Sequence, residues 1–247
     1  MEGFSAQWRQ TRDFAAQTTT TIRIMCPDAP DYVAEAAIRK SVWKAKIATP
    51  GDKPVDLTVD GKRLLRLKVF YECTVSSRHS FMLVEKSAFI LLPAQGSEPL
   101  VRLEYLRHPH SDVPCCHLHV HAHRDDWTFA MIRDGVGSNR REVARRASAE
   151  RAPQLSDIHF PAGGPRLRPA LEDFLAMLIH DLGVDHDEDA LEVLARQRAA
   201  WRTDQVRAMT ASLPEVAAEV LCDAGYMVTP PDDLNVHPDR QAWLTRY

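Results

Sequence analysis

The middle of the chain alternates apolar and polar positions with a period of two, which is the pattern of β-strands with one buried face. Residues 62–75 alternate leucine and valine with arginine and lysine, and three further strand-like segments follow after short connections: 80–93, 99–108 and 115–124. Short connections favour neighbouring strands that run antiparallel. The pattern therefore predicts a meander of four antiparallel strands.

Helical spacing dominates after this region. Residues 169–183 place large apolar side chains at i, i+3, i+4 and i+7, with Pro169 at the start and Gly183 at the end. The spacing predicts this helix and two more, at 187–212 and 214–225. Elsewhere the sequence predicts helices or helix-and-loop segments at 3–17, 30–47, 125–135 and 134–157, and a β-rich strand at 18–25.

These elements indicate an α+β fold, with an antiparallel sheet of about four to six strands in the first half and a helical layer in the C-terminal half. Residues 1–125 are mainly sheet with N-terminal helices, and residues 126–247 are mainly helical. A length of 247 residues is enough for one large core, so we expect both parts to form one compact domain.

The composition narrows the class of protein. A hydrophobic fraction of 45% and a charged fraction of 26% are typical of soluble globular proteins. The formal net charge of −3 excludes a protein that binds nucleic acid through its overall charge, so any basic site must be local.

The cysteines and the apolar runs bear on the compartment. The five cysteines include no C-x-x-C pair, which argues against a zinc ribbon and for reduced thiols in a cytoplasmic protein. No apolar run approaches about 18 residues, and the first residues lack the apolar stretch of a signal peptide. We therefore expect no membrane partner.

The segment CCHLHVHAHR at 115–124 holds four of the eleven histidines, all with the same parity. On a strand the histidines share one face: His117, His119, His121 and His123. The residues between them share the other face: Cys116, Leu118, Val120 and Ala122. Neighbouring predicted strands add charged side chains to the polar face: Arg66, Lys68, Glu72, Arg102 and Glu104. We expect an apolar face against the helices and a polar face that carries the chemistry.

Three kinds of chemistry fit such a face. Two histidines at i and i+2 can bind a divalent metal such as zinc, and the expected ligands are His119, His121 and His159. Other candidates for the third ligand are Glu104, His108 and His110. Imidazoles can instead act as acid and base on a phosphodiester, or one can act as a nucleophile. The predicted catalytic residues are His117, His119, His121, His123 and Arg124.

Two resemblances attach to this region. HLHVHAH resembles the His-φ-His-φ-His-φ-φ motif of the histidine-triad nucleotide hydrolases and transferases, although HPHSDVPCC stands where that family has a Gly- and Gln-containing approach. The resemblance implies His121 as nucleophile with His117 and His119 in support, or a register two residues later. HLHVHAHR and IHFPAGGPRLRPALEDFLAMLI also resemble a group of uncharacterised actinobacterial proteins over most of residues 100–230, which implies no particular activity.

A glycine turn precedes the strongest predicted helix. Gly163 and Gly164 permit unusual backbone angles, and Arg166 and Arg168 stand just before the helix. Helix N-termini attract anions, so these residues predict a phosphate or carboxylate site. The alternative is a tight turn with solvated arginines.

The sequence therefore predicts a phosphodiester- or nucleotide-acting hydrolase, ribonuclease-like, whose partner is RNA or a phosphate-containing small molecule. The alternative is a non-catalytic interaction module that binds a partner protein through its polar sheet face. In the hydrolase, the histidine face and the arginines would form one site. His119 would be needed for activity but would contribute little to stability, whereas truncation of Val120 would destabilise the core.

Overall fold

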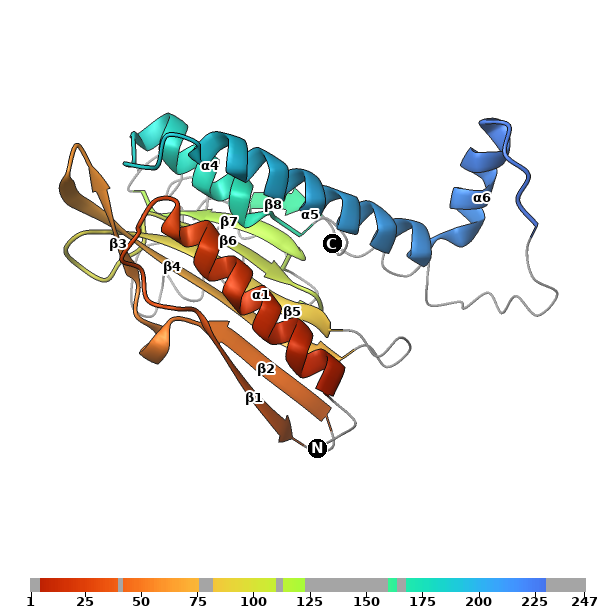
Figure 1. Cartoon of the computed structure of the whole chain (residues 1–247), viewed down its shortest axis with the longest axis horizontal. Helices are drawn as coiled ribbons and strands as arrows, with labels where there is room; N and C mark the ends of the chain where they lie inside the picture. Colours follow the sequence, from red (N-terminus) through yellow and green to blue (C-terminus); the bar gives the residue numbers. More distant parts are fainter. Residues whose placement is uncertain are drawn as a thin grey trace, which may run out of the picture.

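Figure 1 shows the computed structural model of the chain. It describes residues 5–39, 42–75, 82–109, 113–122, 160–163 and 168–229. The helices are α1 (Ser5–Arg23), α4 (Leu171–Leu182), α5 (Ala190–Ser212) and α6 (Pro214–Asp223), with a 3-10 turn at Pro50–Asp52. The strands are β1 (Val33–Arg39), β2 (Val42–Ala48), β3 (Val55–Val59), β4 (Lys62–Val75), β5 (Met82–Pro93), β6 (Val101–Leu106), β7 (Cys116–Val120) and β8 (Phe160–Gly163). None of these helices has the length and apolar character needed to cross a membrane.

The described strands form one antiparallel sheet of eight strands, in the order β1-β2-β4-β5-β6-β7-β8 with β3 paired to β4. The four predicted strands are β4 to β7, and each pairs antiparallel with the next. The predicted meander and the α+β fold class are confirmed. The sheet is larger than expected because β1, β2, β3 and β8 extend it.

The helices cover one face of this sheet. In Figure 1, α1 runs across the strands, and α4 with α5 continues the helical layer beside it. A chain of aromatic rings ties the two layers together: Phe14–Tyr71, Tyr71–Phe89 and Phe89–Phe174 have centroids 4.7, 6.0 and 5.9 Å apart. These rings come from α1, β4, β5 and α4 in that order. The hydrophobic core therefore lies between the sheet and the helices.

The strand predicted at 18–25 is wrong, because residues up to Arg23 belong to α1. Four threonine hydroxyls donate to backbone carbonyls one helical turn earlier: Thr18 to Phe14, Thr19 to Ala15, Thr20 to Ala16 and Thr21 to Gln17. These bonds satisfy the hydroxyls within a helix. Ile22 is buried in the core, and such tertiary packing overrides the β-propensity of the run.

The helix predicted at 30–47 is also wrong, because this segment forms the hairpin of β1 and β2. Trp43, Ala45 and Ile47 alternate inward along β2 and are buried. These three residues repeat with a period of two, whereas the other apolar residues of the segment fit helical spacing. The pairing of β2 with β4 selects the strand over the helix. The sequence pattern also predicts neither β3 nor β8.

The C-terminal helices agree with the predicted segments. α4 ends at Gly183, whose φ of 64° is in the left-handed region that favours glycine and whose N–H donates to Ile179 O at 3.1 Å. α6 has no buried residue and projects away from the sheet (Figure 1). The helix predicted at 125–135 and the segment 134–157 lie outside the described residues.

We expect iodoacetamide near neutral pH to modify Cys222 in the folded protein and to leave Cys73 and Cys116 unmodified. Cys222 is exposed, whereas burial raises the pKa of both buried thiols to about 12 and keeps them protonated. Mass spectrometry of native and urea-unfolded samples measures the difference. Rapid labelling of native Cys73 would contradict this packing.

Candidate functional site

The register of β6 and β7 brings four polar side chains to one face of the sheet. Arg102 pairs with His119, and Glu104 pairs with His117. Because side chains alternate along a strand, all four lie on the face opposite to the helical layer. The predicted convergence of histidine, arginine and glutamate on one face is confirmed.

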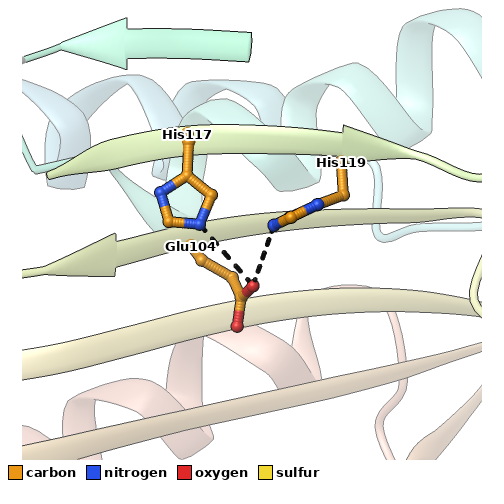
Figure 2. A group of neighbouring side chains, drawn as sticks. All are labelled: Glu104, His117 and His119. Carbon is orange, nitrogen blue, oxygen red and sulfur yellow. Dashed lines mark ion pairs between the residues drawn. The ribbon is translucent and has the colours of Figure 1, made fainter. Parts of the chain in front are cut away.

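Figure 2 shows the Glu104 carboxylate facing the imidazole rings of His117 and His119. Its Oε2 is 3.3 Å from His119 Nε2, 3.8 Å from His117 Nε2 and 3.7 Å from Arg102 Nη2. The two imidazole rings approach edge to face, with centroids 5.0 Å apart. One carboxylate oxygen is therefore shared by two imidazoles and a guanidinium.

The backbone carbonyl of Pro114 orients the His117 ring. His117 Nδ1 donates its proton to Pro114 O at 2.7 Å, so Nε2 carries the lone pair of the neutral ring and faces Glu104. A lone pair directed at a carboxylate is unfavourable unless a proton or a metal ion lies between them. The geometry of His117 is therefore compatible with two states, a protonated ring or a ring that binds a cation.

The group is almost closed off from solvent. His117 and His119 are 2% and 4% exposed, and the Glu104 side chain is 14% exposed. Burial alone would raise the pKa of the Glu104 carboxyl, but the adjacent imidazoles of His117 and His119 and the charge of Arg102 together lower it well below its usual range. Glu104 is therefore ionised at neutral pH.

This burial corrects the expectation that the histidine side of β7 contributes little to packing. Leu118 and Val120, on the apolar side, are only half-buried, whereas His117 and His119 are buried. Polar rings can be buried here because His117 Nδ1 donates to the Pro114 carbonyl and His119 Nε2 lies 3.3 Å from the Glu104 carboxylate.

Glu104, His117 and His119 can hold a divalent ion. One ligand atom from each lies within 4.8 Å of the others. Two atoms each about 2.1 Å from a tetrahedrally coordinated ion lie about 3.4 Å apart, and the two carboxylate–imidazole distances of 3.3 and 3.8 Å are close to that value. The Pro114 carbonyl on His117 Nδ1 is the kind of outer partner that metal-binding histidines have.

His121 lies just beyond β7 and does not belong to this ligand group. Its Nδ1 is 3.7 Å from Glu98 Oε1, and neither ring nitrogen forms a hydrogen bond in the described part of the chain. Burial, together with the charge of Arg102, lowers the pKa of His121. Arg102 Nε is likewise buried without a hydrogen bond. His121 and Arg102 thus each hold a buried nitrogen without a hydrogen bond in the described part of the chain.

Arg168 lies on the opposite face of the sheet, within the helical layer. Its guanidinium carbon is 3.8 Å from the ring centroid of Trp201 in α5 and 5.8 Å from that of Tyr71 in β4. Burial lowers the pKa of Arg168 and raises that of nearby Glu172. A guanidinium between two aromatic rings is a packing contact. The histidine group and Arg168 therefore do not face one common site.

Among the other predicted residues, His108, an alternative ligand, lies beside Glu85, with its Nε2 3.9 Å from Glu85 Oε2, and is not part of the ligand group. Gly163 is the last residue of β8 and pairs with Cys116, so it extends the sheet. The rest lie outside the described residues: His110, His123, Arg124, His159, Gly164 and Arg166.

Sequence reasoning included Glu104 only as one alternative ligand, because strand register cannot be read from one sequence. The sequence feature that pointed to Glu104 was its position on the polar face of the strand that precedes the histidine strand.

Comparison with known proteins adds no assignment. No family model matches the chain, and no curated protein and no solved structure matches it. The resemblances of HLHVHAH and of the longer patterns therefore stay predictions.

Replacing His119 with alanine should lower the free energy of unfolding by about 1–3 kcal/mol, because the largely buried Glu104 carboxylate loses its polar partner at 3.3 Å. Urea unfolding measures the change. His180→Ala on α4 is the control, since an exposed histidine should change stability by less than about 0.5 kcal/mol. Equal stability of the two variants would mean that the imidazole is not a partner of Glu104.

Replacing Arg168 with alanine should lower the melting temperature and leave the affinity for inorganic phosphate unchanged. The variant loses the stacking on Trp201 and Tyr71, which is worth about 1–2 kcal/mol at a desolvated site. Arg168→Lys should restore stability only in part, because an ammonium cannot stack as a planar group. Lost phosphate affinity at unchanged melting temperature would instead support the predicted anion site.

Proposed function

We propose that the protein is a metal-dependent hydrolase that acts on a phosphate-containing substrate. The observation that carries this proposal is the convergence of ligand atoms from Glu104, His117 and His119 within 4.8 Å. Two imidazoles and one carboxylate suit zinc, with iron(II) as the alternative. Three protein ligands leave a coordination position for water or substrate, which is typical of catalytic rather than structural zinc sites.

The neighbouring side chains support phosphate chemistry. A bound divalent ion would polarise a phosphate oxygen and activate a water molecule. Arg102 has its Nη2 3.7 Å from Glu104, and its side chain is 32% exposed, so the guanidinium can also donate to a phosphate oxygen. His121 lies near Arg102, whose charge lowers the pKa of the imidazole together with burial, and its Nδ1 is 3.7 Å from Glu98 Oε1.

The reaction is the hydrolysis of a phosphate ester. The oxygen of water bonds to phosphorus, the bond from phosphorus to one ester oxygen breaks, and a proton from the water ends on the departing oxygen. This balance needs no redox partner and no further cofactor beyond the divalent ion.

A non-catalytic interaction module is the second candidate. The observation that favours it is the burial of His117 and His119, at 2% and 4% exposure. A closed network of one carboxylate and two imidazoles can stabilise a sheet without any turnover. In that case the polar sheet face would bind a partner protein, and the ligand group would hold protons rather than a metal.

Purified, tag-free protein should carry about one equivalent of a divalent metal, and Glu104→Gln should lose it because an amide is a poorer ligand than a carboxylate. Elemental analysis measures the content. Chelation should also lower the melting temperature, since the ion binds the folded chain and stabilises it by mass action. His180→Ala should retain the metal.

Hydrolysis of the model diester bis(4-nitrophenyl) phosphate should stop on chelation and return with added zinc. Metal-free protein with full activity would contradict metal dependence and leave acid–base catalysis by the histidines. Metal-free protein with full stability and no hydrolysis of any phosphate ester would favour the interaction module.

A further inference from the structure

Phe70 on β4 is surrounded by positive charge. The ammonium groups of Lys46, Lys68 and Lys86 lie 5.8, 6.0 and 5.4 Å from the centroid of its ring. These lysines come from three neighbouring strands, β2, β4 and β5. The ring and the lysines are all half-buried, so each keeps some surface open to solvent. We call these four residues the Phe70 cluster.

The Phe70 cluster lies on the same sheet face as the candidate metal centre. The register places Phe70 opposite Ala88, Ala88 opposite Glu104, and Glu104 opposite His117. A second row runs parallel to the first, from Lys68 through Ile90 and Arg102 to His119. Neighbouring strands are about 4.8 Å apart, so Phe70 stands about 10 Å from Glu104 across the small side chain of Ala88.

Two lysines of the cluster are available to an anion. Lys46 forms an ion pair with Asp52, but Lys68 and Lys86 form no ion pair in the described part of the chain. Glu72 stands between Lys46 and Lys86 in the register and only partly offsets the cluster. Several ammonium groups around one ring repel one another, and an anion bound among them would remove that repulsion.

We propose that this face binds single-stranded nucleic acid, with a base stacked on Phe70 and backbone phosphates held by Lys68 and Lys86. An aromatic platform bordered by lysines matches the two halves of a nucleotide, because every base has a stacking face and every linkage has a charge. An acidic protein would engage the lysines but would gain nothing specific from the ring. A duplex would present no unstacked base to Phe70.

This inference rests on the proposed function in one respect: the bound strand is the substrate of the metal centre on the same face. It also reconciles nucleic-acid binding with a net charge of −3, because the basic residues are local. A strand that stacks on Phe70 and continues along the Lys68 row passes Arg102 before it reaches Glu104 and the histidines.

The test is fluorescence anisotropy with a short, unstructured RNA oligonucleotide, carried out in chelator so that no cleavage occurs. Phe70→Leu should weaken binding about tenfold or more, because a branched apolar side chain cannot stack on a base. It should not change the binding of an oligonucleotide that lacks bases. The wild-type protein should bind the single strand more tightly than the matching duplex.

The salt dependence of binding tests the role of the lysines. Lys68→Ala/Lys86→Ala should make the slope of log K against log salt less steep by about 1.4, at roughly 0.7 per lost phosphate contact on a single strand. The matched control is Arg196→Ala/Arg207→Ala, which removes the same charge from exposed positions on α5 and should leave the slope unchanged. Circular dichroism checks that each variant is folded.

The outcomes separate this inference from the proposed function. Absence of binding at low salt, or equal loss in the α5 control and the lysine variant, would overturn it even if the metal is present. In that case the Phe70 cluster would be a surface for an acidic partner protein. Binding that depends on Phe70, together with purified protein in which elemental analysis finds no metal before chelator is added, would support the inference and contradict the metal-dependent hydrolase.

Discussion

The antiparallel register of β4 to β7 is the constraint on which both faces of the sheet depend. It sends Tyr71 and Phe89 toward the helices, where they pack with Phe14 and Phe174. The same register aligns charged and polar side chains on the other face. A slip of β7 by one residue would turn the histidines toward the helices and remove the partners of Glu104, because the side-chain period is two.

Charge is buried on both faces of this sheet, and in each case specific partners make the burial tolerable. Glu104 is held by two imidazoles and Arg102, and Arg168 is held between the rings of Trp201 and Tyr71. A buried charge without partners would lower the free energy of unfolding by several kcal/mol. Glu104 and Arg168 therefore each need neighbouring side chains that stabilise the charge. The sheet separates the two groups, which is why Arg168 cannot take part in chemistry at the histidines.

The polar face combines a closed region with an open one. At β6 and β7 the ligand group is buried and its geometry is set by cross-strand pairing and by the Pro114 carbonyl. Toward β2 and β4 the same face carries half-buried lysines around Phe70. Rigid strands hold both regions, so their separation is defined by strand spacing rather than by loops.

The sequence by itself determined the α+β class, the four-strand meander, the C-terminal helices and the common face of His117 and His119, because each follows from local periodicity. Only the tertiary structure decided that the threonine run is helical, that 30–47 is a hairpin, and that β8 completes the sheet, since packing and long-range pairing override local preference. It alone also decided that Glu104 joins the histidines and that Arg168 lies behind the sheet. Register and layer are long-range properties, and a local pattern carries no information about which strand or helix a residue will meet.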